Sequence, residues 1–420
     1  MDKFIVGKSQ LKGTVKIGGS KNASLPIMAA SLLTDSECRI HKVPDLKDIR
    51  TMIGILECLG KTIVFDNGTL IINSKKNKSF VAPYRLVRTM RASFCCLGPL
   101  LAKRTKAKVA LPGGCVIGPR PVDLHIKGLR QLGAQISIEK GYCLAQAKRL
   151  EGANIYLGGV FGSSVLATAN VLMAATLAEA ETLIEHAACE PEIESLANFL
   201  KKMGAQIKGE GTPTLKIKGV KSLSGCEFEV IPDRIEAGTF IAASLATKSS
   251  LNLQGADASH LRSVIDTAKR IGADINIDGN SSISVKPAKR LNPVNITTLP
   301  YPGFPTDLQA QFMACLCLAD GISLITEKIY PDRFMHVAEL NRMGASVQRN
   351  GPYAIIEGKH ELFGAEVMAS DLRASAALVI AALSAKGRTQ VARVYHIDRG
   401  YEKIEDKLKK LGAKIERRKQ

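Results

Sequence analysis

The sequence predicts an α/β fold of two domains, each made of three repeats that close around buried helices. A turn in which an apolar residue precedes Gly joins an amphipathic helix to an alternating strand and recurs about every 70 residues. Glycine there permits the left-handed backbone that ends a helix. A second helix, apolar nearly all round and therefore buried, recurs six times. The chain of 420 residues is long enough for two such domains. The six turn glycines are Gly60, Gly133, Gly204, Gly272, Gly344 and Gly412. The six apolar helices are expected at residues 23–33, 90–101, 166–178, 237–246, 308–318 and 373–384.

Composition and the N-terminus predict a globular cytoplasmic protein. Hydrophobic residues make up 45% of the chain and charged residues 23%, which argues against disorder. The N-terminus has no signal-peptide pattern, and the longest apolar stretches, residues 165–178 and 374–385, are shorter than the ~18–20 residues that cross a bilayer. Ten cysteines are too few for a disulfide scaffold, which favours a reducing compartment.

The starts of the six apolar helices are candidates for binding anions. Each start has a capping residue, and four of them add a cationic side chain: Lys21, Arg91, Arg234 and Arg373. If these ends converge on a cleft, their dipoles and cations attract anionic substrates. Ordinary capping explains any one start equally well, but six together favour the cleft.

Residues 111–125 form a loop rich in Gly and Pro that carries Cys115 and Arg120 and leads into a helix with Pro121 near its start. A thiol flanked by glycines can reach a substrate when its loop closes, whereas a lone cysteine elsewhere is usually a small buried hydrophobe. The other cysteines on the apolar helices, Cys95, Cys96, Cys315 and Cys317, are expected in the core. Neither cysteine nor histidine spacing indicates a metal site.

Two further residues are candidates for chemistry. Asp307 follows a Pro-Gly-rich loop at a helix start, where its carboxylate could act as a general base or simply as an N-cap. Arg399 precedes the last surface helix, expected at residues 398–411, and a cation at a helix start indicates an anionic ligand.

With these motifs the chain resembles the family of the UDP-N-acetylglucosamine 1-carboxyvinyltransferases, the enolpyruvyl transferases that commit their sugar nucleotide to peptidoglycan synthesis. The resemblance rests on eight segments in order along the whole chain: residues 19–23, 89–93, 115–125, 190–193, 302–311, 333–337, 371–375 and 396–401. It implies two inside-out α/β barrels with an active-site cleft between them. The expected domains are residues 21–231, and residues 232–420 together with the N-terminal strand 1–20.

The resemblance also implies roles for individual residues. Cys115 is the loop thiol, which donates a proton or assists product release and should be the residue that fosfomycin inactivates. Asp307 contacts the sugar hydroxyl and is the expected base. The phosphoenolpyruvate contacts implied by the resemblance are Lys21, Asn22, Arg120 and Arg399. The expected contacts to the UDP-sugar and the cleft are Arg91, Arg120, Pro121, Val122, Asp123, Leu124, Ser163, Ser164, Val165, Ile329, Asp371 and Arg373. One departure is Leu166, which replaces the glycine usual at the start of the third buried helix.

This reaction needs an acid, a base and cations, so we expect no cofactor and no metal. The partners implied are phosphoenolpyruvate and UDP-N-acetylglucosamine, and the sequence leaves the oligomeric state open. One alternative is the shikimate-3-phosphate enolpyruvyl transferase, against which the Cys115 loop and residues 302–307 count. The other is a nucleic-acid-binding protein, prompted by the net charge of +19. The charge is dispersed and aromatic residues are only 5%, which disfavours a base-stacking surface.

Overall fold

The computed structural model describes residues 2–112, 122–279, 281–287 and 289–419. These residues form two compact units: an N-terminal unit of residues 19–112 and 122–231, and a C-terminal unit of residues 2–18 and 232–419. Each unit has a hydrophobic core of its own. In the described residues the chain crosses between the units after Gly18 and after Ile231.

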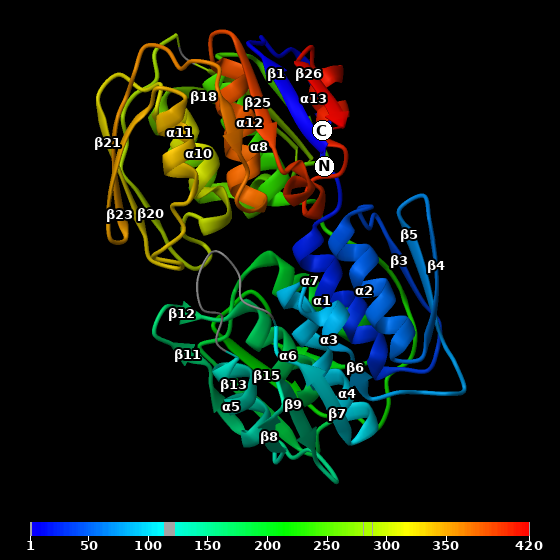
Figure 1. The fold of residues 1–420 in the computed structure, drawn as a ribbon. Helices are drawn as coiled ribbons and strands as arrows, with labels where there is room; N and C mark the ends of the chain where they lie inside the picture. Colours follow the sequence, from blue (N-terminus) through cyan, green and yellow to red (C-terminus); the bar gives the residue numbers. More distant parts are fainter. Residues whose placement is uncertain (1, 113–121, 280, 288, 420) are drawn as a thin grey trace. The chain divides into compact units, whose positions relative to one another are not determined.

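The centre of the N-terminal unit consists of helices with almost no polar face (Figure 1). Their side chains are nearly all buried, as the sequence predicts for small apolar helices. Amphipathic helices pack outside them. The central helices are α1 (Lys21–Ala30) with η1 (Ser31–Leu33), η2 (Arg91–Cys96) with α4 (Leu97–Arg104), and α6 (Val165–Ala175); the others are α2 (Lys47–Cys58), α3 (Tyr84–Val87), α5 (Asp123–Gln131) and α7 (Pro191–Lys202).

Four-stranded sheets surround these helices, and all three in the described N-terminal unit share one topology. One edge strand is parallel to its neighbour, and the other three strands are antiparallel. In sheet order they are β16 (Glu227–Glu229), β3 (Cys38–His41), β5 (Thr69–Ser74) and β4 (Lys61–Asp66); β6 (Val81–Ala82), β7 (Lys106–Ala110), β9 (Tyr142–Gln146) and β8 (Gln135–Glu139); and β10 (Asn154–Tyr156), β13 (Glu181–Glu185), β15 (Thr214–Lys218) and β14 (Gln206–Lys208). A small hairpin, β11 (Gly158–Gly159) and β12 (Gly162–Ser163), lies outside them.

The C-terminal unit repeats this plan. Three apolar helices again pack together at its centre, with sheets and amphipathic helices around them (Figure 1). The central helices are α8 (Arg234–Ala246), η4 (Thr306–Leu308) with α10 (Gln309–Leu316), and α12 (Leu372–Ser384); the others are η3 (Ala258–Leu261) with α9 (Arg262–Ile271), α11 (His336–Arg342), η5 (Val394–Arg399) and α13 (Ile404–Lys410).

The N-terminal strand completes the last repeat of the C-terminal unit. Strand β1 (Asp2–Gly7) pairs antiparallel with β25 (Arg388–Ala392) and β26 (Lys414–Lys419), in the place that a hairpin strand occupies in the other sheets. The fourth strand is β24 (Glu366–Met368), parallel to β25. The remaining sheets are β18 (Ala273–Asp278), β19 (Ser282–Pro287), β17 (Leu251–Gln254) and β2 (Gly13–Lys16), and β20 (Ile296–Thr298), β21 (Ile322–Glu327), β23 (Tyr353–Glu357) and β22 (Ser346–Asn350).

The local predictions for the repeats are largely confirmed. All six turn glycines have φ between 87° and 120°, the left-handed region that favours glycine. The last surface helix differs from its expected range, because it divides into η5 and a shorter α13 that begins only at Ile404. Gly400 and Lys403, which has φ 43°, separate the two segments.

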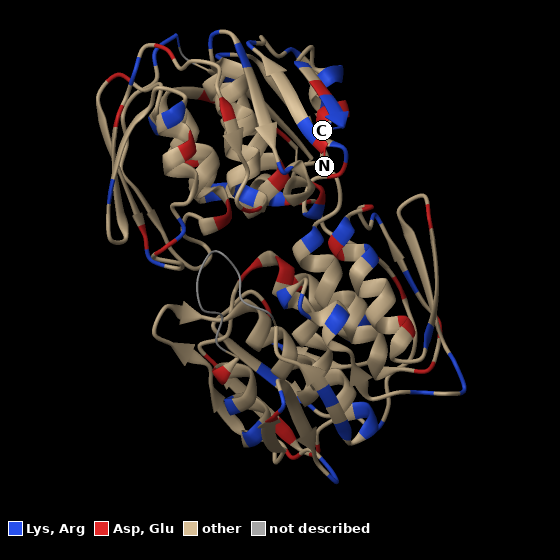
Figure 2. Ribbon diagram, viewed as in Figure 1, with Lys and Arg blue, Asp and Glu red and all other residues tan. Residues whose placement is uncertain are grey.

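Charge is spread over both units. Figure 2 shows Lys and Arg on helices, strands and loops, with Asp and Glu interspersed. Within the described part of the chain, no helix has the length and apolar character needed to cross a membrane.

Candidate active site

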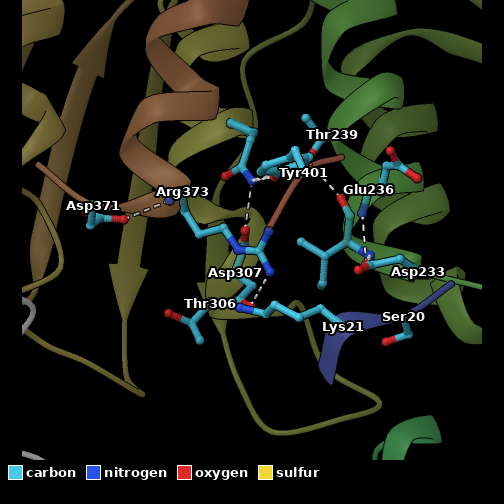
Figure 3. Close-up of polar contacts among 12 residues, drawn as sticks. Ser20, Lys21, Asp233, Glu236, Thr239, Thr306, Asp307, Asp371, Arg373 and Tyr401 are labelled. Carbon is cyan, nitrogen blue, oxygen red and sulfur yellow. Dashed lines mark hydrogen bonds and ion pairs between the residues drawn. The ribbon is translucent and has the colours of Figure 1, made fainter. Parts of the chain in front are cut away.

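The carboxylate of Asp307 in the C-terminal unit is held by two arginines, of which Figure 3 shows Arg373. Nη1 of Arg333 donates to Oδ1 at 2.9 Å, and Nη2 of Arg373 donates to Oδ2 at 2.8 Å. Both arginine side chains are at most 8% exposed, whereas that of Asp307 is 27% exposed. The carboxylate therefore faces accessible space while its cationic partners are fixed in the interior.

This geometry bears on the N-cap alternative for Asp307. The residue lies within η4, whose N-cap is Pro305, and no side chain caps that helix. The carboxylate accepts hydrogen bonds from two guanidinium groups. The N-cap alternative is therefore wrong. Since a guanidinium only donates hydrogen bonds, Asp307 acts as an acceptor toward both arginines.

The electrostatics of the arginines match this arrangement. Burial by itself lowers the pKa of Arg373, but the charge of Asp307, its hydrogen bond and the other nearby groups together outweigh burial, and the pKa lies above its ordinary value. The pKa of Arg333 is raised by the same balance of burial against the charges of Asp307 and Asp371. Both side chains are therefore permanent cations beside Asp307.

A buried carboxylate links the residue before Asp307 to the loop that follows β21. Glu327, at the end of β21, is fully buried. Its Oε2 accepts from the hydroxyl of Thr306 at 2.9 Å, and its Oε1 accepts from the backbone N–H of Ile329 at 2.9 Å. Arg333 also donates to the Thr306 hydroxyl at 3.0 Å. The structure thus connects Ile329 to the Asp307 cluster through Glu327.

A buried network of hydroxyl and amide groups packs against Asp307 and Arg373. The Tyr401 hydroxyl lies 2.8 Å from that of Thr239 on α8 and accepts from Nε2 of Gln311 on α10 at 3.1 Å. The same Gln311 nitrogen donates to the backbone oxygen of Asp307 at 2.9 Å. The guanidinium of Arg373 lies over the Tyr401 ring, 5.4 Å from its centroid. Burial raises the pKa of Tyr401, so this hydroxyl stays protonated.

Asp371 has a structural position in the same unit. Its Oδ1 caps α12 by accepting from the backbone N–H groups of Arg373 at 2.8 Å and Ala374 at 3.1 Å. Asp371 thereby fixes the start of the helix that carries Arg373. Arg399 is the half-buried last residue of η5.

In the N-terminal unit, Lys21 begins α1 and is 9% exposed. The side chain of Ser20 caps this helix by accepting from Ala23 N at 3.2 Å. The Lys21 ammonium lies 3.5 Å from the buried carboxylate of Asp48 on α2. Asn22 follows on the same first turn and is half-buried. A cation is thus held at a helix start, where the dipole alone would disfavour it.

The predicted sugar-nucleotide residues come together in part. Ser164 caps α6 by accepting from Ala167 N at 3.3 Å, and Val165 is the first residue of that helix. A β-carbon added to Gly159 of the β11–β12 hairpin would lie 3.0 Å from Leu124 at the start of α5. The hairpin that ends at Ser163 therefore packs on the turn that contains Leu124. The other predicted residues here are Val122, the N-cap of α5; Asp123, its exposed first residue; and Arg91, the half-buried first residue of η2.

A buried amide connects the three segments that carry these residues. Asn170 on α6 donates to Phe94 O of η2 at 3.0 Å and to Nδ1 of His125 on α5 at 2.9 Å. Burial and, to a smaller extent, the charge of Arg91 lower the pKa of His125 to about 3, so its ring is neutral. Asn170 therefore determines how the starts of η2, α5 and α6 lie relative to one another.

Three predicted residues, Cys115, Arg120 and Pro121, lie outside the described residues. The cysteines expected in the core, Cys95, Cys96, Cys315 and Cys317, are buried, and burial raises the pKa of each thiol. Among the described residues, no cluster of His, Cys, Asp or Glu could hold a metal ion.

Sequence reasoning gave no role to Arg333, Glu327 or Asp48. Arg333 begins one of the eight segments on which the resemblance rests, but its pairing with Asp307, 26 residues away, is a tertiary contact. Glu327 is an acidic residue at the end of a strand, and Asp48 is an acidic residue in the first turn of a helix, and both are common positions for acids. Nothing in their local sequence signals that both are buried.

The fold defines a class of protein, the two-domain enolpyruvyl transferases. The structure is similar to that of the enolpyruvyl transferase NikO from Streptomyces tendae, with a TM-score of 0.89 at 23% identity over 99% of this chain and 98% of that chain. It is also similar to EPSP synthase from Acinetobacter baumannii, with a TM-score of 0.75 at 20% identity over 100% of both chains. The predicted fold of two inside-out α/β barrels is thus confirmed.

Residues 5–408 match the model of the family EPSP synthase (3-phosphoshikimate 1-carboxyvinyltransferase). The chain is 54% identical over 418 residues to a UDP-N-acetylglucosamine 1-carboxyvinyltransferase of Methylacidiphilum infernorum, covering 99% of both chains. It is 51% identical to UDP-N-acetylglucosamine 1-carboxyvinyltransferase 2 of Carboxydothermus hydrogenoformans, again over 99% of both. The chain belongs to the EPSP synthase family of enolpyruvyl transferases.

Proposed function

We propose that this chain transfers the enolpyruvyl group of phosphoenolpyruvate to the 3-hydroxyl of UDP-N-acetylglucosamine and releases phosphate. The observation that carries the proposal is its identity of about half, over nearly full length, to proteins named for that reaction. The EPSP synthase from Acinetobacter baumannii is only 20% identical, which favours the sugar nucleotide over shikimate 3-phosphate as the acceptor. The reaction would make this protein the committed enzyme of peptidoglycan synthesis in the cytoplasm.

Asp307 is the proposed base. It accepts the proton of the sugar 3-hydroxyl as that oxygen attacks C2 of phosphoenolpyruvate, while the C3 methylene group is protonated to a methyl group. Arg333 and Arg373 hold both carboxylate oxygens, which fixes the orientation of the Asp307 carboxylate. The tetrahedral intermediate then loses one methyl proton and phosphate, which restores the enol ether.

The cationic residues bind the two anionic substrates. We assign phosphoenolpyruvate to Lys21, Asn22, Arg120 and Arg399, since a guanidinium pairs with carboxylate or phosphate in a bidentate manner. Lys21 is supported by its position at the start of α1, where the first-turn N–H groups also attract an anion. We assign the UDP-sugar to Arg91, to residues 120–124 and 163–165, and to Ile329, with Asp371 and Arg373 supporting Asp307.

Product formation tests the proposal. The chain is incubated with phosphoenolpyruvate and either UDP-N-acetylglucosamine or shikimate 3-phosphate, and both phosphate release and product mass are measured. We expect turnover with the sugar nucleotide alone. Turnover with shikimate 3-phosphate alone would reverse the assignment of the acceptor, and turnover with neither would refute the reaction.

Cys115 is the proposed proton donor or product-release residue, and it has its own test. A free thiol with an ordinary pKa near ~8.5 is mostly protonated at neutral pH and needs no large shift to act as an acid. We expect Cys115→Ser to reduce turnover by at least about a hundredfold, in the range of a lost general acid, and Cys115→Asp to retain it. Fosfomycin should inactivate the wild-type chain and spare both variants. A fully active Cys115→Ser would remove Cys115 from the mechanism.

A further inference from the structure

A fully buried asparagine of the N-terminal unit, Asn170, joins α6 to three other helical segments. Its Oδ1 accepts from the backbone N–H of Gly98 in the first turn of α4. Its Nδ2 donates to Phe94 O of η2 at 3.0 Å and to Nδ1 of His125 on α5 at 2.9 Å. Both polar atoms of the side chain are therefore bonded, and every one of these bonds leaves its own helix.

Backbone groups fix the orientation of this amide. The N–H of Gly98 can only donate and Phe94 O can only accept, so Oδ1 and Nδ2 cannot be exchanged. Nδ2 therefore faces His125, and Nδ1 of that ring must be the acceptor. Because burial and, to a smaller extent, the charge of Arg91 lower the pKa of His125, the ring is neutral and its proton lies on Nε2.

Glycines on two neighbouring helices let their backbones approach α6 at this point. A β-carbon on Gly98 of α4 would lie 2.2 Å from the backbone oxygen of Asn170. A β-carbon on Gly128 of α5 would lie 2.4 Å from Cγ2 of Val171. The amide thus lies where η2, α4 and α5 all pack against α6, and a shift of one helix there is transmitted to the others.

The fold itself does not require an amide at this position. The C-terminal unit repeats the same plan, and its third central helix, α12, is capped by Asp371 as α6 is capped by Ser164. Six residues after the cap, α6 has Asn170 whereas α12 has Ala377, which is also fully buried. A buried amide costs free energy unless its hydrogen bonds are made. Its use in α6 therefore indicates a geometric requirement of the N-terminal unit.

The segments that the amide joins carry residues assigned to the UDP-sugar. Arg91 begins η2, Leu124 lies in the first turn of α5, and Val165 begins α6. Each of them precedes a member of the hydrogen-bond network of Asn170 by at most five residues. The amide is thus one or two helical turns away from three of the assigned contacts.

We propose that Asn170, together with His125, is a positioning residue for the UDP-sugar contacts of the N-terminal unit. It holds the starts of η2, α5 and α6 in one arrangement, so that the contacts on all three meet the same ligand. The inference rests on the proposed function, which assigns those contacts. None of the three bonds goes to α1, which carries Lys21 and Asn22, so the effect should fall mainly on one of the two substrates.

Steady-state kinetics and isothermal titration with UDP-N-acetylglucosamine test the inference. Asn170→Ala removes all three bonds, and we expect it to raise Kd and KM for the UDP-sugar about tenfold, with KM for phosphoenolpyruvate and kcat changed by less than about threefold. His125→Phe keeps an aromatic ring and removes only the acceptor Nδ1, so it should raise Kd about fourfold.

The matched control is Leu172→Ala. Leu172 lies on the same helix and is fully buried, so its truncation leaves a cavity and destabilises the unit without removing a hydrogen bond. Its Kd and both KM values should stay within about twofold of wild type. An equal rise for both substrates in Asn170→Ala, or the same rise in Leu172→Ala, would overturn the inference. If Asn170→Ala does not fold, the comparison of Kd between His125→Phe and the control decides it.

Nitrogen NMR of the imidazole rings separates this inference from the proposed function. The chain has seven histidines, and the signals of His125 are those that His125→Phe lacks. At neutral pH we expect the proton on Nε2 in the wild-type chain. In Asn170→Asp it should move to Nδ1, because a carboxylate only accepts. A wild-type ring with its proton on Nδ1 would refute the contact whatever the reaction. Absence of product from the wild-type chain would instead refute the proposed function and leave the NMR result to judge the contact.

Discussion

Asp307→Asn tests the centre of the proposed site, because it alters one atom of the carboxylate that two buried arginines hold. The substitution replaces one oxygen by an NH₂ group, which donates hydrogen bonds. Whichever way the amide turns, either Arg333 or Arg373 then faces a donor instead of its acceptor. The variant therefore loses the negative charge and at least one of these two bonds.

The size of the effect follows from burial. Removing one partner of a fully buried ion pair costs about 3–5 kcal/mol. Asp307 is 27% exposed, so water can replace part of what the arginines lose, and we expect about 2–3 kcal/mol. For a unit of this size that free energy corresponds to a fall in melting temperature of about 5–10 °C. Turnover should fall by about 10²–10⁴, the usual contribution of a general base.

Calorimetry and phosphate release measure the two effects, and isothermal titration should show that the UDP-sugar still binds. The matched control is Asp332→Asn. Asp332 accepts from Nη2 of Arg349 at 2.7 Å, but its side chain is 68% exposed, so its loss should cost less than about 1 kcal/mol and leave turnover unchanged. Wild-type turnover in Asp307→Asn, or a melting temperature equal to that of the control, would refute the role of Asp307 as an acceptor held by two arginines.

Two further predictions concern the N-terminal unit. The pKa of His125 is lowered to about 3 in the folded chain, whereas in the unfolded chain it is about 6.5. Between these pH values the unfolded chain binds a proton that the folded chain does not bind. The free energy of unfolding should therefore fall by about 1.4 kcal/mol per pH unit as the pH drops from about 6.5 toward 3. Urea unfolding should show a flatter pH profile in His125→Gln, and a profile parallel to wild type would contradict the assignment. Gly19→Ala should destabilise the protein by at least about 3 kcal/mol in thermal unfolding, because its β-carbon would overlap Lys42 O. Gly18→Ala has 3.4 Å to its nearest neighbour and should cost less than about 1 kcal/mol, so equal losses in the two would be the opposing result.

The repeats could be predicted from the sequence because their signals are local. A glycine after an apolar residue ends a helix through its own φ angle, and the six φ values confirm it. Caps were predicted less well, because a cap depends on the preceding chain. The side chains of Ser20, Ser164, Asp233 and Asp371 cap their helices, but the helix at Arg91 follows Met90 without a side-chain cap. The hydroxyl of the nearby Thr89 donates backward to Leu86 O instead.

The site could be predicted only where a residue type and a local signal coincide. Lys21 is a cation at a helix start, and Asp307 lies at a helix start after a Pro-Gly-rich loop, so the sequence identifies both as candidates. What the sequence cannot mark is the set of buried groups that orient them, since each is an ordinary residue locally and acquires its role through a contact far along the chain. Arg333 meets Asp307 across 26 residues, and Asp48 meets Lys21 across 27.

The difference between residues that touch substrate and residues that orient them has a physical reason, and this reason determines which substitutions the site tolerates. A residue that touches substrate must be of one chemical kind, whereas a residue that orients it must satisfy a partner in the interior, where an unmatched charge is costly. Glu327 illustrates the requirement on an orienting residue. Its two carboxylate oxygens accept from the hydroxyl groups of Thr298 and Thr306, and its Oε1 also accepts from two backbone N–H groups. No neutral side chain of its size can replace it without leaving one of these donors without an acceptor. Substitutions at such positions should therefore reduce stability and activity together, as expected for Asp307, while those at substrate contacts without a buried partner reduce activity alone. Measuring both quantities for each variant would separate the two classes without any further structure.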